Sequence, residues 1–304
     1  MLGPEEHEKH SAALSSLGAA VFLTGLKIVV GLRSGSLGIL AEAAHSTLDF
    51  AAAAITLFAV RVASKPADRE HTYGHGKVEN LSALVETLLL LGTCAWIIYQ
   101  SISRLVSGHV VVDASIWTFG VMLVSIAVDI SRSRMLYRIA AKHRSQALEA
   151  DALHFSSDVW SSVVVIIGLA GVKLGQAFPS LRFLQEADPV AGLVVGAIVV
   201  MVSVKLGVRA IQGLLDASPE GVAEKIKLRV EAIEMVLDCH AVRVRHSGPL
   251  HFVDLHITLD GSLSLQTAHD LTEHVEQAVK EILPGADVTV HPEPSPKCDQ
   301  PQRS

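Results

Sequence analysis

The sequence predicts an α-helical membrane protein with six transmembrane helices, followed by a cytoplasmic α+β domain. Half of the 304 residues are hydrophobic and only 18% are charged, with a mean hydropathy of +0.41. Long apolar segments occupy residues 1–216, where 17 basic side chains balance 17 acidic ones. The rest of the chain carries 8 basic and 14 acidic side chains, so it holds the whole formal net charge of −6.

The composition also excludes several classes of protein. Neither half has a basic patch, so nucleic acid is not an expected partner. Three scattered cysteines (Cys94, Cys239 and Cys298) form no CxxC pair, which argues against a disulfide framework and against a thiolate zinc site. The 15 histidines divide 8 and 7 between the halves, so any metal site should use nitrogen and oxygen ligands.

Six segments reach the length of about 20 mostly apolar residues that a spanning helix needs. Basic residues flank the connections after the second and fourth segments more densely than the others, which predicts that both termini are cytoplasmic. We therefore expect a cytoplasmic segment over 1–11 and a membrane domain over 12–216. The six expected spans are Ala12–Leu32, Leu37–Ala63, Leu81–Leu105, Ile116–Leu136, Ala150–Leu174 and Pro189–Leu215.

The soluble domain is expected over 217–292, with a flexible tail over 293–304. Ser218-Pro219-Glu220 has the pattern of a helix start, with an N-cap and then a proline, and helical spacing continues over 220–237. A second amphipathic helix and three alternating segments follow, giving the order αββαβ of a ferredoxin-like, metallochaperone-like sandwich. The alternating segments are Ala241–His246, His251–Leu259 and Asp287–His291, with a hairpin turn at Ser247-Gly248-Pro249.

An acid-Ala-x-His-x-x-x-Asp pattern occurs twice, at 42–49 in the second span and at 151–158 in the fifth. Ionisable groups inside spans cost about 3 kcal/mol each, so they are functional hypotheses by default. His and Asp four residues apart share one helical face, and the two spans run in opposite directions, as in the inverted repeats of many transporters. Four nitrogen and oxygen ligands suit tetrahedral Zn²⁺. The predicted ligands are His45, Asp49, His154 and Asp158.

The alternative is one internal ion pair in each helix, which would only hold the bundle together. Three further ionisable residues in the spans, Lys27, Glu86 and Asp129, occur singly. For these we expect pairing or hydration rather than metal ligation.

With these motifs the chain resembles the cation diffusion facilitator family of divalent metal/proton antiporters, of the bacterial zinc and ferrous-iron efflux type. The resemblance covers the six spans, both HxxxD motifs, the segment His71–Glu79 and the αββαβ domain. It implies a Y- or V-shaped homodimer in the inner membrane of a prokaryotic cell, exporting Zn²⁺ or related ions from the cytoplasm in exchange for protons. It also implies that the four span residues form the transport site.

Further sites follow from the resemblance alone. Asp68, His71 and His75 match a loop metal site of bacterial members, although such a short loop could also be merely solvated. Lys77 and Asp216 match an ion pair between the membrane and cytoplasmic domains. A binuclear zinc site in the cytoplasmic domain would use His240, His256, His269, His291 and Glu293.

In that last site Glu293 replaces the usual Asp and follows Pro292, while His246, His251 and His274 are expected to be solvated. Relatives that move zinc, cadmium and ferrous iron often have Asp where this chain has His45, and a His there resembles zinc-selective members. A second imidazole favours Zn²⁺ over harder ions but does not exclude Fe²⁺, Co²⁺ or Cd²⁺.

Two function classes other than transport remain open. An intramembrane metalloenzyme is disfavoured because HExxH is absent and protein ligands fill all four positions. The second class is a metal-sensing subunit that does not transport. The expectation is a transporter and not an enzyme.

Overall fold

A computed structural model describes residues 4–34, 37–107, 116–177, 187–248 and 250–295. The chain divides into two compact units, Met1–Ile211 and Gln212–Ser304. The first is helical and the second contains a sheet, as the sequence predicts.

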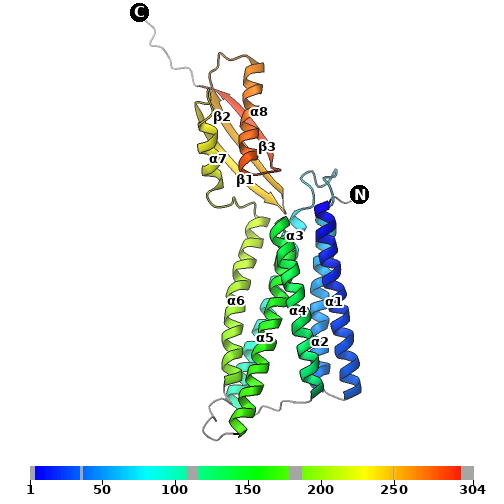
Figure 1. Cartoon of the computed structure of the whole chain (residues 1–304). Helices are drawn as coiled ribbons and strands as arrows, with labels where there is room; N and C mark the ends of the chain where they lie inside the picture. The colour runs from blue at the N-terminus through cyan, green and yellow to red at the C-terminus, as the bar shows by residue number, and fades with distance from the viewer. Residues whose placement is uncertain (1–3, 35–36, 108–115, 178–186, 249, 296–304) are drawn as a thin grey trace, which may run out of the picture. The chain divides into compact units, whose positions relative to one another are not determined.

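Among the described residues of the first unit, six long helices run side by side along its length (Figure 1). Helix α2 contacts α1, α3 and α5, and α4 contacts α1 and α5, so α2 and α5 lie next to each other inside the bundle. The helices are α1 (Pro4–Ser34), α2 (Leu37–Ala63), α3 (Lys77–Ser107), α4 (Ile116–His143), α5 (Gln146–Ala177) and α6 (Ala187–Leu214).

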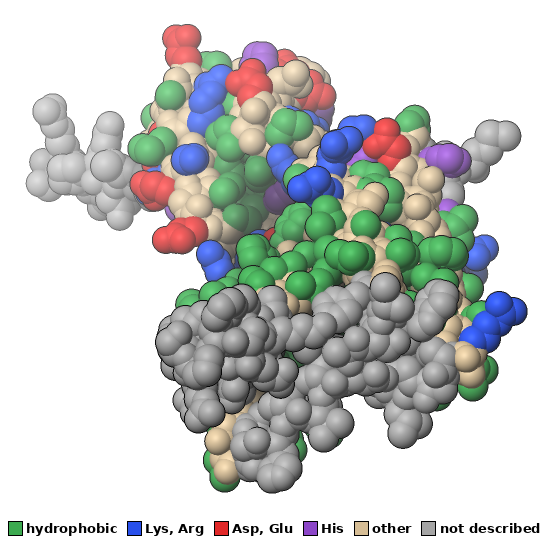
Figure 2. Space-filling model, turned by 60° about the horizontal axis from the view of Figure 1, so that its bottom comes forward, with side chains coloured by type: hydrophobic (Ala, Val, Ile, Leu, Met, Phe, Trp, Pro, Cys, Tyr) green, Lys and Arg blue, Asp and Glu red, His purple; other side chains and the backbone are tan. Residues whose placement is uncertain are grey.

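The outer surface of this unit is apolar. Large side chains such as Phe22, Phe58, Trp96 and Met201 are more than half exposed, and Figure 2 shows hydrophobic side chains gathered over the helices. Within the described residues, four stretches, in α1, α2, α3 and α6, are long and apolar enough to cross a membrane. A broad apolar surface of this kind is suited to lipid rather than water.

Helix α1 begins at Pro4, so it starts eight residues before the first predicted span at Ala12. The reason is a buried polar contact that hydropathy does not detect. Lys9 is 4% exposed, and its Nζ lies 2.9 Å from Oε1 of Glu79 in α3. Ser145, between α4 and α5, donates to the other oxygen of Glu79, so the early turns of α1 are held against neighbouring elements.

The second unit has the predicted order αββαβ. Strands β1 and β2 pair antiparallel, β2 and β3 pair parallel, and the sheet order is β1-β2-β3. Val253, Leu255 and Ile257 of β2 are buried against the helices, which confirms the predicted alternation. The elements are α7 (Val222–Glu231), β1 (Asp238–Ser247), β2 (Leu250–Leu259), α8 (Leu265–Ile282) and β3 (Asp287–Pro294).

The first helix of this unit starts later than predicted. Gly221 is its N-cap in a left-handed conformation (φ 72°), while Val222 donates to the carbonyl of Pro219 in a preceding turn. The predicted cap at Ser218 was therefore wrong, because the reversal at Gly221 separates that motif from the helix. The helix also ends at Glu231 rather than 237, before a second left-handed residue at Met235 (φ 71°).

The last strand is longer than predicted and includes residues assigned to a flexible tail. It reaches Pro294, and the backbone N–H of Ser295 donates to the carbonyl of Leu259 over 2.7 Å. Since alternate residues of a strand point their N–H groups the same way, Pro292 and Pro294 occupy outward positions that need no donor. The prolines therefore fit an edge strand.

The buried face of β2 should dominate the stability of the second unit. Leu255→Ala removes a side chain that is 1% exposed and should lower the free energy of unfolding by about 2–5 kcal/mol. Leu265→Ala makes the same change at a residue that is 88% exposed and should cost less than about 0.5 kcal/mol. Urea denaturation of the full-length protein, followed by the amide NMR signals of the second unit, measures both losses. Equal losses would contradict this assignment of the core.

Candidate metal sites

Three predicted ligands of the membrane site meet between α2 and α5. The Nε2 atom of His154 lies 3.2 Å from Oδ1 of Asp49 and 3.7 Å from Oδ2 of Asp158. The three residues offer ligand atoms that all lie within 4.8 Å of one another. His154 is almost fully buried, and the two carboxylates are only slightly exposed. An imidazole nitrogen between two carboxylates is a donor set for a divalent transition metal.

The fourth predicted ligand, His45, lies on α2 one turn before Asp49. Its side chain falls outside the part of the chain that the structure describes. The spacing of four residues puts it on the same helical face as Asp49. Its participation stays a prediction.

A polar chain supports α5 beside this site. Ser16 of α1 donates to Oδ2 of Asp151 over 3.0 Å, and Nη2 of Arg132 in α4 donates to Ser16 Oγ over 3.1 Å. The Arg132 guanidinium also lies 3.5 Å from the ring centre of Phe155. Asp151 belongs to the repeated motif, but its link to Ser16 and Arg132 had no sequence signal because it joins three distant segments.

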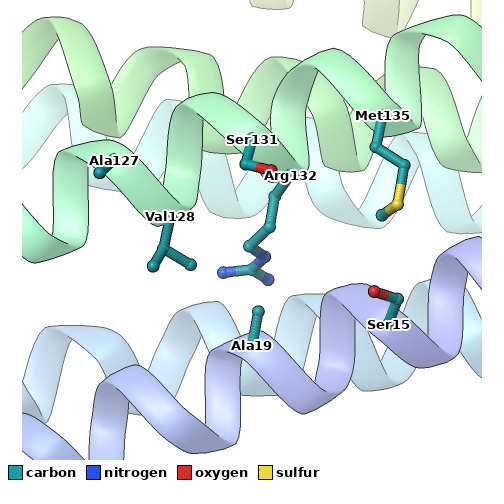
Figure 3. Close-up of a pocket in the computed structure, with 7 residues that line it drawn as sticks. All are labelled: Ser15, Ala19, Ala127, Val128, Ser131, Arg132 and Met135. Carbon is teal, nitrogen blue, oxygen red and sulfur yellow. The ribbon is translucent and has the colours of Figure 1, made fainter.

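Arg132 also lines a pocket of about 320 Å³ between α1 and α4 (Figure 3). Most of the pocket lining is small or apolar, and a space of this size can hold several water molecules. Arg132 itself is only 4% exposed, and its charge is balanced by Asp129. The other lining residues are Ser15, Ala19, Ala127, Val128, Ser131 and Met135.

The three ionisable span residues that were not expected to bind metal have polar partners. Lys27 donates to Ser46 Oγ over 2.6 Å, and Asp129 lies 3.3 Å from Nη1 of Arg132. Glu86 accepts hydrogen bonds from Thr56 and Ser82 through one carboxylate oxygen. Pairing or hydration was predicted for all three, and the structure shows pairing.

The loop between α2 and α3 brings together all three of its predicted ligands. Asp68 lies 3.4 Å from Nδ1 of His71 and 3.3 Å from Nε2 of His75, and the group's ligand atoms lie within 4.8 Å of one another. The backbone N–H groups of His71 and Glu70 donate to the Asp68 carboxylate and lower its pKa. Gly74 (φ 76°) closes the turn between the two histidines.

The sheet of the second unit aligns three predicted ligands of the cytoplasmic site in a row. Strand register places His240 opposite His256, and His256 opposite His291, on the face away from the helices. Glu293 lies in the next row and contacts two of these histidines. Its Oε1 lies 2.8 Å from His256 Nδ1, and its Oε2 lies 3.4 Å from His240 Nε2. The longer glutamate thus reaches two histidines despite Pro292.

Two residues of the predicted cytoplasmic site, His291 and His269, do not belong to the group of closely spaced ligand atoms. His291 lies beside the group, with Nε2 3.8 Å from Glu293, but the three residues whose ligand atoms come together are His240, His256 and Glu293. His269 is not brought to this group. It lies on α8, is exposed and faces Glu273 at 3.6 Å, because α8 packs on the opposite face of the sheet.

The predicted contact between Lys77 and Asp216 would join different units and stays a prediction. A residue that sequence reasoning missed is Asp238, whose Oδ2 lies 2.8 Å from Nδ1 of His240. Its signal was present, because residues two apart in a strand share a face.

Known families match both units of the chain. The cation efflux transmembrane domain matches residues 13–215, and the cytoplasmic domain of cation efflux proteins matches 219–295. The cation-efflux pump FieF of Serratia proteamaculans is 34% identical over 287 residues, covering 93% of this chain and 92% of the relative. FieF of Yersinia enterocolitica is 34% identical over 288 residues, covering 94% and 92%. A solved chain of CzrB, described as a candidate zinc transporter, is 28% identical and covers 26% of this chain and 99% of its own, with a TM-score of 0.25.

The contact with His256 lowers the pKa of Glu293, so this carboxylate should stay ionised to lower pH than an ordinary glutamate. Replacing His256 by Ala should raise the pKa of Glu293 toward its usual range. In the unsubstituted protein, the contact between Glu293 and His256 should be lost only as the pH falls through the lowered pKa of Glu293. Carboxyl ¹³C NMR titration of the metal-free protein measures this shift. His269→Ala is the matched control and should leave the Glu293 titration unchanged, whereas an equal effect of both variants would refute the grouping.

Proposed function

The chain belongs to the cation efflux family of membrane transporters, and on that premise we propose that it exports Zn²⁺ from the cytoplasm in exchange for protons. Family membership gives cation efflux, not enzymatic catalysis, as the activity. The metal and the counter-ion are the proposed part. The observation that carries it is the position of His154 Nε2 between Asp49 and Asp158.

The donor set supports a divalent transition metal as substrate. Imidazole nitrogen and carboxylate oxygen suit Zn²⁺, and His45 would complete a tetrahedral set of four. Fe²⁺, Co²⁺ and Cd²⁺ accept the same donors, so a broader range of exported metals is the alternative.

Competition between metal and protons at these residues supplies the coupling. Metal binding needs neutral imidazole and ionised carboxylate, whereas protonation removes both donors. Histidine changes charge in the physiological range, so one site can hold either metal or protons. In an alternating-access cycle, Zn²⁺ would enter from the cytoplasm and displace protons, and reprotonation from outside would release it.

The second unit would serve as the metal-sensing, dimerising part of a homodimer. Its row of three histidines with Glu293 lies on an exposed face of the sheet, where a metal ion could tighten the association of two cytoplasmic domains. The acidic character of this half supports attraction of cytoplasmic cations. We place the transporter in a prokaryotic inner membrane with both termini cytoplasmic.

Reconstituted protein tests transport directly. Proteoliposomes with a zinc-sensitive dye inside should show Zn²⁺ uptake that depends on an imposed pH gradient. Asp49→Asn, which removes the charge but keeps the size of a proposed ligand, should reduce the rate at least about tenfold. Asp260→Asn, a change of the same kind at an exposed residue of the second unit, should not.

A metal-sensing subunit that does not transport would bind Zn²⁺ without any uptake, so this outcome would refute export. Uptake that persists in Asp49→Asn would refute the assignment of the transport site. Uptake that ignores the pH gradient would refute proton exchange alone.

Metal choice gives a separate test at His45. His45→Asp replaces a nitrogen donor by a harder, charged oxygen donor, so Mn²⁺ and Fe²⁺ flux should rise relative to Zn²⁺ flux. Flux of Zn²⁺, Cd²⁺, Fe²⁺ and Mn²⁺ should be compared in the same vesicles. An unchanged order of the four metals would show that His45 does not set selectivity.

A further inference from the structure

The first residues of β1 present two polar side chains on one face. Asp238 and His240 lie on the exposed face of the sheet, while Cys239 between them is fully buried in the core. The Oδ2 atom of Asp238 lies 2.8 Å from Nδ1 of His240. Thr258 and Glu293 continue the row of Asp238 across the sheet, directly beside the row of histidines.

This contact determines which nitrogen of His240 is available. An ionised carboxylate only accepts hydrogen bonds, so the contact requires that Nδ1 carry the hydrogen. In a neutral ring Nε2 then keeps its lone pair. That atom lies 3.4 Å from Oε2 of Glu293, on the side of the ring where the group's ligand atoms meet.

The regular strand backbone is interrupted directly after His240. Ala241 has a left-handed conformation (φ 50°), which is unfavourable for a residue with a Cβ, and the pairing of β1 with β2 shifts register between His240 and Arg243. Such bulges redirect neighbouring side chains and are frequent beside functional sites. Here the bulge follows directly on the pairing of His240 with His256.

We propose that Asp238 is a positioning residue of the cytoplasmic metal site: its carboxylate holds the ring of His240 with Nε2 directed at the position of the metal. The inference rests on the cytoplasmic site of the proposed function. It adds a residue that does not itself bind the ion but fixes the orientation and tautomer of one that does.

Zn²⁺ affinity provides the first test. Full-length protein in detergent should carry Asp49→Asn, Asp68→Asn and Asp158→Asn, which remove carboxylate ligands from the other two candidate metal sites. Competition with a chromophoric chelator then measures Zn²⁺ binding at the cytoplasmic site. Adding Asp238→Ala should weaken Zn²⁺ binding about tenfold. Asp238→Asn should recover part of this loss, because the amide oxygen still accepts from Nδ1.

Asp254→Ala is the matched control, since it removes another exposed carboxylate two residues from His256 and should change affinity by less than about twofold. Equal losses at Asp238 and Asp254 would indicate a general charge effect and overturn the proposal. Unchanged affinity in Asp238→Ala, with binding abolished by Glu293→Gln, would also overturn it while leaving the site intact. Binding that survives Glu293→Gln would overturn the cytoplasmic site and this role together.

The tautomer of His240 provides a second readout that needs no metal. Histidine ¹⁵N NMR of the metal-free, full-length protein, assigned with His240→Gln, should show hydrogen on Nδ1 of the neutral ring. Asp238→Ala should move that hydrogen to Nε2 in part of the population, and Asp238→Asn should restrain the change. A tautomer ratio that is the same in all three proteins would overturn the proposal.

Discussion

The contact between His154 and the carboxylates of Asp49 and Asp158 joins α2 to α5 through buried polar atoms, in a bundle whose outer surface is apolar. A charge at this depth is unfavourable without partners, so the surrounding helices have to supply them. Ser16 and Arg132 do so around Asp151, and their hydrogen bonds connect α1, α4 and α5. The same polar contacts therefore hold the helices together and position the residues of the candidate site.

Periodicity was sufficient to predict most of the architecture. The six helices, the αββαβ order and the buried face of β2 follow from apolar spacing, which is a local property. What local spacing could not predict were contacts between distant segments. The ion pair of Lys9 with Glu79 holds the start of α1, but its partner lies in a distant helix, so the local sequence does not predict it. Ser218 is not the cap of α7 because Gly221 reverses the chain between Ser218 and the helix.

The candidate sites likewise differ in whether local sequence spacing predicts them. Asp68, His71 and His75 lie within one short loop, so their sequence spacing already predicts their proximity. The cytoplasmic group depends on strand register, which aligns residues 35 positions apart such as His256 and His291. His269 was assigned from the resemblance, and no property of α8 alone shows that the sheet separates it from the other ligands within one chain. Register and sheet face are tertiary information.

The two prolines near the end of β3 restrict how this domain can associate. The outer edge of a sheet normally offers N–H donors to any extended segment that approaches it, which is a route to aggregation. At Pro292 and Pro294 those donors are missing from the outward positions of an edge strand. A neighbouring chain therefore cannot easily extend the sheet beyond β3 by adding a strand.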